Sequence, residues 1–358
     1  MLHTHHRLAT AARPAMAHIP AESVHLVVTS PPYPMVEMWD AGFAEQSPAV
    51  ATALDALDGP TAFEAMHAIL DPIWADCHQA LVPGGLLCVN VGDATRKLGP
   101  DFQLFSNHAR TIQGILKAGF QLLPDILWRK PTNAPNKFMG SGMLPAGAYV
   151  TYEHEYIIIA RKGGRRLFKS TADRERRRRS AFFWEERNQW FSDIWQGLTG
   201  VRQAITSKAR SRSAAFPLDL PARLIDMYSL QDDVVLDPFA GTGTTSLAAA
   251  AAGRHSIAIE RDPQLRPLFD AMLARVPEVS ARRAEQRLVA HQQFVDARRA
   301  AGKTIKHRNP VYDIPVITTQ ETALALPVTT TITADPPHTW TAATELGALP
   351  PGMQATLF

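Results

Sequence analysis

The sequence predicts an α/β protein with a mostly parallel, twisted sheet and helices on both faces of that sheet. Short apolar runs alternate with longer amphipathic stretches, which is the pattern of βαβ units. A glycine-rich turn at 241–243 also joins a buried apolar run to an alanine-rich stretch, as the first turn of a nucleotide-binding α/β fold does. These observations predict a single α/β domain with a ligand site at the glycine turn.

The composition is that of a globular protein. The 358 residues are 46% hydrophobic, which is enough for one large core or for one core and a small satellite domain. No apolar stretch reaches the roughly 18 residues of a membrane span, and the start, MLHTHHRLAT, lacks the apolar core of a signal peptide. Cys77 and Cys88 lie in apolar segments and are predicted to be buried and reduced. We expect a soluble cytoplasmic protein with no membrane partner.

The expected elements follow the chain in order. Apolar runs predict strands at 25–30, 86–93, 121–130, 152–162, 233–239 and 255–262. Amphipathic stretches predict helices at 61–81, 102–118, 217–229 and 244–253, and a long charged helix at about 279–303. The Pro-Gly-Gly sequence at 83–85 predicts a turn, and the Pro, Gly and Asn content of 131–147 predicts a long loop.

Two regions fall outside this alternation. Residues 163–215 carry many arginines and little periodicity, which indicates an insertion or a small subdomain. Its tryptophans, Trp184, Trp190 and Trp195, are interpreted as a small core rather than as base-stacking residues. The tail from about 310 is rich in Thr and Pro, and we expect it to be draped over the core or disordered.

The stretch DDVVLDPFAGTGTTSLAAAAAGRHSIAIERDP is the most informative one. A buried strand ends at Asp237, a tight turn contains Gly241 and Gly243, and the next strand ends at Glu260. Glycines let the backbone approach a ligand, and a carboxylate at the end of the next strand can bind a ribose diol. This arrangement predicts a cofactor site.

The residues of this stretch leave more than one cofactor open. A dinucleotide site prefers a third glycine where this chain has Ser246, and Asp237 would repel a pyrophosphate. An acid at that position suits a ligand with a positive charge, such as S-adenosylmethionine. A nicotinamide-dependent oxidoreductase stays open as the alternative, and a titration with each cofactor would separate the two.

A second motif, TSPPY at 29–33, follows an apolar run near the N-terminus. Together with DPFAGTGTT at 237–245, it resembles the amino-methylating DNA methyltransferases, which methylate cytosine N4 or adenine N6. The order of the two motifs is similar to the β-type permutation of that family, in which the target-recognition region lies between them. The resemblance covers roughly residues 20 to 265 and implies the S-adenosylmethionine-dependent methyltransferase (Rossmann-like) fold with a circularly permuted motif order.

The resemblance gives the tetrad Ser30-Pro31-Pro32-Tyr33 a catalytic role. The Ser30 hydroxyl and the Pro31 carbonyl would accept hydrogen bonds from the target amino group and free its lone pair. The prolines hold the turn rigid and remove competing N–H donors, and Tyr33 would stack on a base flipped out of the duplex. Direct transfer needs no cysteine nucleophile.

The first residue of the tetrad bears on the target base. In this family serine is typical of cytosine-N4 enzymes, whereas aspartate or asparagine is typical of adenine-N6 enzymes. We therefore expect a cytosine-N4-specific DNA methyltransferase, with an adenine-N6 enzyme of the same family as the alternative. A non-catalytic DNA-binding regulator on a methyltransferase scaffold is the alternative from another class.

The resemblance also implies a cofactor-binding set for S-adenosylmethionine. It includes residues of the glycine turn, a ribose-binding acid, two residues that close over the cofactor and one that precedes the tetrad: Asp237, Phe239, Gly241, Gly243, Thr244, Glu260, Phe216, Pro217 and Thr29. Asp93 is interpreted either as facing the site or as a helix cap or loop anchor.

The predicted partner is double-stranded DNA. Basic residues of the insert are expected to contact phosphates or guanine edges, namely Arg165, Arg166, Lys169, Arg174, Arg176, Arg177, Arg178 and Arg179. Asn133, Asn136 and Lys137 form a second candidate contact. A homodimer and a separate cognate restriction endonuclease are left open.

No metal is expected, because the chemistry needs none. The histidines His3, His5 and His6 are interpreted as part of a mobile tail, and His154 as structural. The predicted organisation is a catalytic region at 1–162, a target-recognition insert at 163–213, a cofactor-binding region at 214–308 and a tail at 309–358.

Overall fold

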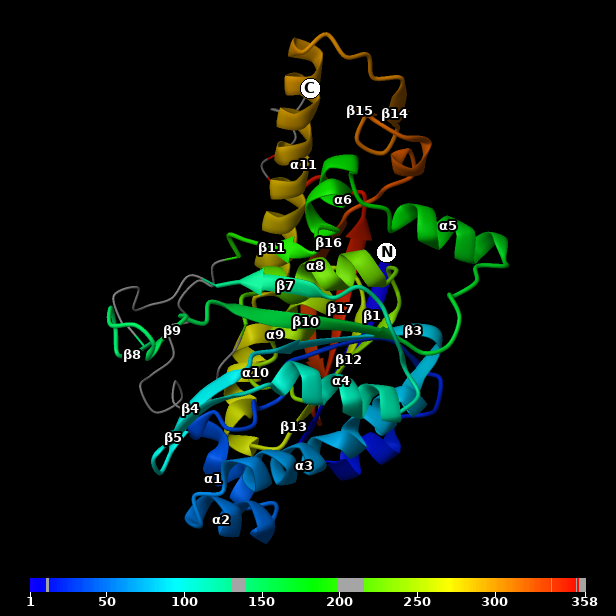
Figure 1. The fold of residues 1–358 in the computed structure, drawn as a ribbon. Coiled ribbons are helices and arrows are strands. Elements are labelled where there is room, and N and C mark those ends of the chain that lie inside the picture. Colours follow the sequence, from blue (N-terminus) through cyan, green and yellow to red (C-terminus); the bar gives the residue numbers. More distant parts are fainter. Residues whose placement is uncertain (11–12, 131–138, 199–215, 336, 352, 354–358) are drawn as a thin grey trace.

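The computed structural model describes residues 1–10, 13–130, 139–198, 216–335, 337–351 and 353. Its largest element is a mixed sheet (Figure 1), whose strands in spatial order are β11 (Ile194–Trp195), β7 (Ile126–Arg129), β10 (His154–Arg161), β3 (Leu81–Val91), β2 (Val24–Thr29), β12 (Val234–Asp237), β13 (His255–Glu260), β1 (Leu2–Thr10), β17 (Thr339–Leu346) and β16 (Pro327–Asp335). The short strand β6 (Gln121–Leu122) also pairs with β10. The predicted α/β class is confirmed.

The centre of the sheet is parallel. Strand β2 pairs in parallel with β3 on one side and with β12 on the other, and β13 runs parallel to both β12 and β1. The next central strand after β2 is β3, on one side of the β2–β12 pair, and the strand after β12 is β13, on the other side. The carboxyl ends of two such strands form a crevice, which is the usual ligand position in open α/β sheets.

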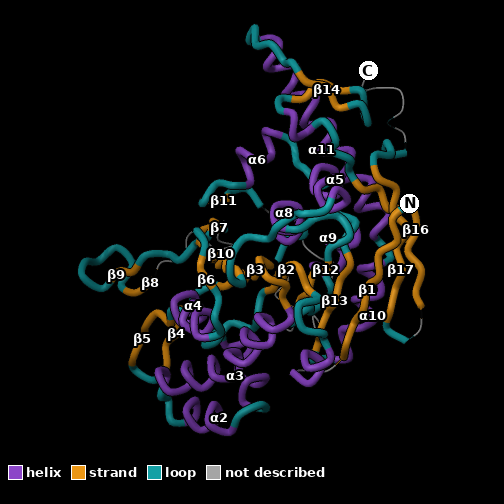
Figure 2. The backbone as a smooth tube through the Cα atoms, turned by 90° about the vertical axis from the view of Figure 1, so that its right-hand side faces the viewer, coloured by secondary structure: helices purple, strands orange, loops and turns teal. Residues whose placement is uncertain are grey.

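Helices cover both faces of the sheet (Figure 2). Their bounds are α1 (Asp40–Ala44), α2 (Pro48–Asp55), α3 (Gly59–Ala80), α4 (Asn107–Lys117), α5 (Thr171–Arg179), α6 (Trp184–Trp190), α8 (Asp219–Tyr228), α9 (Thr244–Ala251), α10 (Arg266–Leu273) and α11 (Val276–Ala300). Strand β2 shows how the two faces form, since Val27 belongs to the core under α3, while Leu26 and Val28 belong to the core under α8 and α9.

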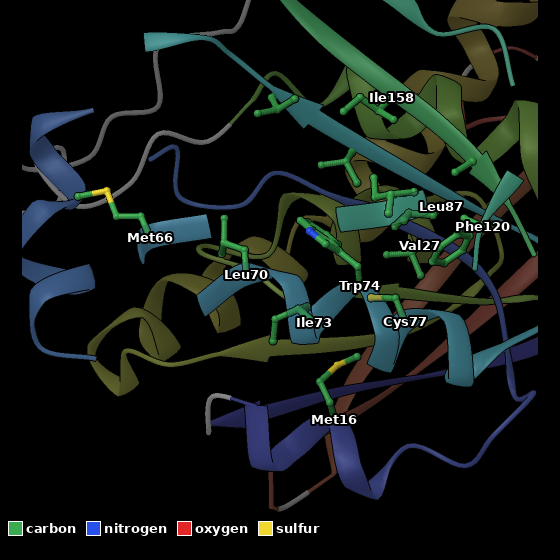
Figure 3. Close-up of a cluster of buried hydrophobic side chains, with 14 of the residues drawn as sticks. Met16, Val27, Met66, Leu70, Ile73, Trp74, Cys77, Leu87, Phe120 and Ile158 are labelled. Carbon is green, nitrogen blue, oxygen red and sulfur yellow. The ribbon is translucent and has the colours of Figure 1, made fainter. Parts of the chain in front are cut away.

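Helix α3 buries one continuous stripe against the sheet (Figure 3). Its residues Met66, Leu70, Ile73, Trp74 and Cys77 recur at the spacing of one helical face and pack in one cluster with side chains of β2 and β3. Each fully buried side chain of this kind contributes about 1.5–3 kcal/mol to folding. On the opposite face, the alanine-rich run of α9 is buried throughout, so that this helix lies close to the strands.

Two of the predicted elements differ in detail. The expected strand 121–130 is divided into β6 and β7, because a proline at 124 cannot donate a ladder hydrogen bond. The expected helix 102–118 begins at Asn107, since 101–105 form β5 (Asp101–Phe105), which pairs with β4 (Ala94–Leu98) as a hairpin. The loop 139–150 holds a second small hairpin, β8 (Met139–Gly140) with β9 (Ala148–Tyr149).

The two ends of the chain differ more from expectation. The interpretation of the N-terminal histidines as a mobile tail is wrong, because β1 lies inside the sheet between β13 and β17 and buries His6. The described part of the Thr-rich tail is ordered: β16 and β17 extend the sheet, and β14 (His307–Asn309) pairs with β15 (Ile314–Val316). Burial alternates along β1, but two of its buried residues, Thr4 and His6, are polar, so the sequence carries little apolar alternation there.

The segment 163–198 joins the main body. Helix α6 packs on α11 through an ion pair in which Arg287 Nε lies 2.6 Å from Glu186 Oε1. Trp190 and Trp195 are buried in the core, as predicted, whereas Trp184 is more exposed and stacks on Phe294. Both cysteines are buried and unpaired. Across the described ranges, every helix is too short or too polar to cross a bilayer.

Candidate active site

The site is centred where β2 and β12 end side by side. The Thr29 hydroxyl donates a hydrogen bond of 2.6 Å to Asp237 Oδ1, and the backbone N–H of Phe239 donates to the same oxygen at 3.0 Å. This contact joins residues that are 208 positions apart in the sequence. The first residue of the TSPPY motif and the first residue of the DPFAGTGTT motif therefore touch, as two halves of one site.

The tetrad follows β2 directly and is fixed by polar contacts. Ser30 Oγ lies 3.0 Å from the Tyr33 hydroxyl. That hydroxyl donates to Glu155 Oε2 at 3.0 Å and accepts from Asn90 Nδ2 at 2.9 Å. Glu155 Oε1 lies 2.5 Å from the ammonium nitrogen of Lys130. The Tyr33 ring is thus held at its hydroxyl end by β3 and β10.

The glycine turn follows β12. Gly241 and Gly243 have φ values of +53° and +89°, in the left-handed region that side chains disfavour. A Cβ atom on Gly243 would lie 2.5 Å from the Phe269 ring, so that only glycine fits there, whereas the position of Gly241 faces open space. The Glu260 carboxylate holds the turn from the next strand, since it accepts from the N–H of Gly241 at 2.7 Å and from that of Asp262 at 2.8 Å.

Of the two acids of the site, Asp237 is buried and Glu260 is partly buried. Burial raises the pKa of Asp237 to about 6, although hydrogen bonds from Thr29, Thr245 and the Phe239 N–H act in the opposite direction. Burial also raises the pKa of Glu260, against backbone N–H groups of Asp262 and Gly241. A cation placed against Asp237 would lower its pKa again, and its binding would be strengthened in return.

A cavity of about 1290 Å³ lies between the tetrad and the glycine turn. Common small-molecule pockets measure about 300–1,000 Å³, so this cavity has room for a cofactor and a second ligand. Most of the residues predicted for catalysis or cofactor binding line it: Ser30, Pro31, Pro32, Tyr33, Phe216, Asp237, Phe239, Gly241, Thr244 and Glu260. Thr29, Pro217 and Gly243 are neighbours of lining residues rather than part of the lining.

The lining fits a polar ligand at the glycine turn. The hydroxyl oxygens of Thr242 and Thr244 are buried and have no hydrogen-bond partner among the described residues. Buried hydroxyls without partners are costly, and a ligand with polar groups would satisfy them. Phe239, Pro238 and Leu265 add apolar contact area in the same cavity. The donor set and the open space over Gly241 therefore fit S-adenosylmethionine, with its carboxylate, ammonium and ribose hydroxyls.

Asp93 serves as an anchor at the start of α4. Its Oδ1 accepts from the backbone N–H of His108 at 2.9 Å, and the ring of His108 and the hydroxyl of Tyr152 contact its Oδ2 at 2.8 and 3.0 Å. Burial acts to raise its pKa, but the hydrogen bonds from His108 hold the pKa below its usual value. The contacts support the anchor interpretation of this acid.

The structure does not bring the basic residues of the insert together with the tetrad. Strands β2, β3 and β12 end at the site, which we call the carboxyl edge of the sheet, and begin at the opposite, amino edge. Strand β10 is antiparallel to β3, so the segment after Arg161 starts at the amino edge. Figure 1 shows α5 at the right, while the hairpins β4–β5 and β8–β9 lie at the left, beyond the carboxyl edge.

The basic residues of this segment, at the amino edge, differ in burial and in ion pairing. Arg166 and Arg176 are partly buried and pair with Asp233, at 2.6 and 3.5 Å. Exposed members are Arg165, Lys169, Arg174, Arg177 and Arg178, and Arg179 is partly buried. The predicted contacts at Asn133, Asn136 and Lys137, and the basic stretch 206–213, lie outside the described residues.

Three residues of the hydrogen-bond network around the tetrad were not predicted from the sequence, namely Asn90, Lys130 and Glu155. For Glu155 the sequence offered only an acid at the start of an apolar run, and it is the structure that shows this run, as β10, starting at the carboxyl edge. Across the described ranges, no group of three His, Cys, Asp or Glu side chains is arranged to hold a metal ion.

Comparisons with known proteins agree with this geometry. The sequence matches the N6/N4 methyltransferase family, described as DNA methylase, over residues 24–269. It is 47% identical over 325 residues to the type II methyltransferase M.MthZI of Methanothermobacter thermautotrophicus, which covers 90% of each chain. It is 45% identical to the type II methyltransferase M.MjaI of Methanocaldococcus jannaschii, over 75% of this chain and 90% of that one.

A solved structure shares the fold. TTHA0409 of Thermus thermophilus, a DNA modification methylase described as putative and complexed with S-adenosyl-L-methionine, superposes with a TM-score of 0.59 at 33% identity. The match covers 76% of this chain and 95% of that chain. The part of the fold that is shared is therefore almost the whole of the solved protein.

Proposed function

The chain belongs to the N6/N4 family of DNA methylases, and from this premise we propose that it methylates the N4 amino group of a cytosine flipped out of duplex DNA. As a member of that family it is a DNA methyltransferase that uses S-adenosylmethionine. The observation that carries the proposal is the position of Ser30, which lines the cavity next to the buried Asp237.

The cofactor supplies an electrophilic methyl group on a sulfonium centre when it is bound. We propose that Asp237 binds its ammonium group, because this carboxylate is buried among neutral donors and burial raises its pKa. Glu260 retains acceptor capacity on both oxygens and would bind the ribose hydroxyls. The hydroxyls of Thr242 and Thr244, which have no partner among the described residues, would contact the remaining polar groups.

The tetrad would act on the amino group of the target. An exocyclic amino nitrogen is a poor nucleophile, because its lone pair is delocalised into the ring. Acceptors at Ser30 Oγ and at the Pro31 carbonyl would bind its two hydrogens and localise the lone pair toward the methyl group. The nitrogen would form its bond to the methyl carbon as the C–S bond of the sulfonium breaks, so that the sulfur leaves as a neutral thioether, and the proton that the nitrogen loses would pass to solvent. Pro31 and Pro32 contribute no N–H that could compete for the same acceptors.

The duplex would lie across the carboxyl edge, where the tetrad and the two hairpins are. The loop of the β8–β9 hairpin exposes Met143 and Leu144, at 86% and 69% of their surfaces. Tyr149 of the same hairpin stacks on Phe102 of β5, with ring centroids 5.0 Å apart. Apolar side chains presented next to the site suit contact with exposed base faces. A contact of the basic segment 163–179 with DNA requires a duplex that reaches the amino edge as well.

The likeness to type II methyltransferases bears on the biological setting. On that likeness we propose that the target is a short duplex site of a restriction–modification system, whose nuclease would be a separate chain. A solitary methyltransferase would use the same site chemistry.

The experiment that tests the target base uses labelled S-adenosylmethionine and mixed-sequence duplex DNA, followed by digestion to nucleosides and mass analysis. Label on N4-methylcytosine is the expected result. Label on N6-methyladenine would overturn the choice of base and leave the transfer chemistry in place. The Ser30→Ala variant is the matched control and should lose the label, because it keeps the fold and removes the proposed acceptor.

A further inference from the structure

The hydroxyl of Tyr33 has more neighbours than a base-stacking ring requires. It lies 3.0 Å from Glu155 Oε2, 2.9 Å from Asn90 Nδ2 and 3.0 Å from Ser30 Oγ. A phenol carries one proton and can accept two hydrogen bonds, so that these three contacts use its full capacity. The direction of each hydrogen bond can therefore be worked out.

Glu155 takes the only proton of Tyr33. A carboxylate accepts hydrogen bonds and donates none, and the other oxygen of Glu155, Oε1, is paired with the ammonium of Lys130 at 2.5 Å. Without that proton, the two oxygens would face each other at 3.0 Å with only lone pairs between them. Burial, and next the charge of Glu155, raises the pKa of Tyr33 well above its usual value, so the phenol keeps the proton that it donates.

Asn90 uses its amide nitrogen in the same network. Its Nδ2 donates one hydrogen to Tyr33 at 2.9 Å and one to Glu155 Oε2 at 2.6 Å. The opposite amide orientation would place a carbonyl against the carboxylate, which is unfavourable. One acceptor position then remains on the Tyr33 oxygen, and Ser30 must donate its proton to it.

The backbone supports this geometry. Glu155 lies at the start of β10, whose Ile157 is in register with Asn90 of β3. Between them, a Cβ atom on Gly92 would lie 3.1 Å from both Glu155 Cγ and Tyr33 Cε2. A glycine at 92 therefore lets the acid and the ring meet over the end of β3, and only 12% of the Glu155 side chain is exposed.

We propose that Glu155 is a positioning residue that sets the hydrogen-bond direction of the tetrad, so that Ser30 meets the target amino group as an acceptor only. This inference rests on the proposed function, in which Ser30 accepts a hydrogen of that amino group. The order is amino N–H to Ser30, Ser30 O–H to Tyr33, and Tyr33 O–H to Glu155.

This arrangement solves a problem that is specific to serine. An aspartate at the same position accepts by nature, whereas a serine hydroxyl can either donate or accept. A serine proton that pointed into the cavity would face the hydrogens of the target amino group. It would weaken binding of that group in the orientation that methyl transfer needs. The remote carboxylate, acting through the Tyr33 hydroxyl, gives Ser30 the acceptor character that an aspartate has on its own.

The test compares Glu155→Gln with wild type in single-turnover methyl transfer. In the variant, the ammonium of Lys130 attracts the new amide oxygen, so the amide nitrogen faces the Tyr33 hydroxyl. Tyr33 can then no longer donate its proton to residue 155 and donates it to Ser30 instead. The Ser30 proton is thereby directed into the cavity. We expect the rate to fall about 100-fold, the size of effect seen when one oriented hydrogen bond at a reacting group is lost. The dissociation constant for S-adenosylmethionine and the thermal midpoint should stay at wild-type values.

Glu153→Gln is the matched control. Glu153 is two residues away, is more exposed and pairs with Arg129 at 3.5 Å. The same change of charge there should leave the rate unchanged. A Glu155→Gln rate equal to that of wild type would overturn the proposal, as would an equal loss in both variants.

A double variant separates positioning from a merely structural role. In Tyr33→Phe the Ser30 hydroxyl can rotate freely, so we expect a smaller loss, of about tenfold, and Glu155→Gln should add nothing to it. The double variant should therefore be faster than Glu155→Gln alone. Additive losses would overturn the proposal. If Glu155→Gln does not fold, a wild-type rate in Tyr33→Phe would overturn it as well.

Failure of the proposed function has a different outcome. In that case wild type itself transfers no methyl group to cytosine N4 in any duplex. An active wild type with an unaffected Glu155→Gln variant would contradict only the positioning role.

Discussion

Two buried aspartates mark the ends of strand β12 in opposite electrostatic settings, since Asp233 directly precedes the strand and Asp237 is its last residue. Asp233, at the amino edge, is paired with Arg166 at 2.6 Å, and hydrogen bonds from that guanidinium hold its pKa below the usual value against the effect of burial. Asp237, at the carboxyl edge, accepts hydrogen bonds from neutral donors, and burial raises its pKa to about 6. The same residue type is thus a structural anchor at one edge and an available anion at the other.

The residues at the two ends of one strand can therefore contribute separately to stability and to ligand binding. A buried charge with a protein partner is satisfied within the fold, while a buried charge without one favours a ligand of opposite charge. The two edges of the sheet should therefore respond in opposite ways to matched substitutions.

The largest expected effect is on stability, at the amino edge. Asp233→Asn leaves Arg166 and Arg176 without their buried anion, and we expect the free energy of unfolding to fall by about 3 kcal/mol. Chemical denaturation measures this loss. The affinity for S-adenosylmethionine, measured by titration calorimetry on the folded protein, should not change. A loss of affinity equal to that of Asp237→Asn would mean that the two edges are not independent.

The second effect is on cofactor binding, at the carboxyl edge. Asp237→Asn keeps the shape of the side chain and removes its charge, so the affinity for S-adenosylmethionine should fall about 100-fold. The variant should be at least as stable as wild type at about pH 7.5, because the buried charge itself opposes folding there. Unchanged affinity would remove Asp237 from the cofactor site.

The third effect is a pH dependence of the affinity for S-adenosylmethionine, which we expect to come from Asp237 and not from Asp233. The pKa of Asp237 in the folded protein is about 6, above its ordinary value of 3.8, so the carboxylate is lost as pH falls through 6. A cationic ligand binds the carboxylate form, and its affinity should fall by up to about tenfold between about pH 7 and pH 5.

Calorimetry in buffers of different ionisation enthalpy should show proton release on binding near pH 6. Asp233→Asn should keep this dependence and Asp237→Asn should lose it. A dependence that persists in Asp237→Asn would assign the titration to another group.

The smallest expected effect concerns the exposed arginines at the amino edge. With the duplex on the carboxyl edge, substitution of Arg177 and Arg178 by Gln should lower the slope of log affinity against log salt by less than about one charge. Binding of duplex DNA across a salt series measures it. A slope lowered by nearly two charges would show that these arginines contact DNA, as the sequence alone predicted, and that the duplex reaches the amino edge.

Much of this architecture could be predicted from the sequence, because its signals are local. The apolar run that ends at Asp237, the two glycines with positive φ and the acid at Glu260 form one contiguous stretch, and the structure brings them together as expected. The tetrad could be placed at the same site by its resemblance to a family, and the Thr29–Asp237 hydrogen bond joins the two motifs.

The rest depended on contacts between distant segments. The position of the arginine-rich segment follows from the antiparallel direction of β10, which no local pattern reveals. Glu155 is in the tetrad network because β10 lies beside β3, and a carboxylate in a strand looks the same in sequence whether it faces solvent or the hydroxyl of Tyr33. The N-terminal histidines were misjudged for the same reason, since the strands that cover them follow much later in the chain.

The central position of β1 has a consequence for how the chain reaches this structure. The hydrogen bond between His6 and Ser256 spans 250 residues, and β17, on the other side of β1, follows even later. During synthesis β1 must therefore wait as an unpaired strand until most of the chain has left the ribosome. Contacts of such long sequence separation form slowly. A ribosome that stalls before β17 would release a product with an open sheet edge, which is a template for aggregation.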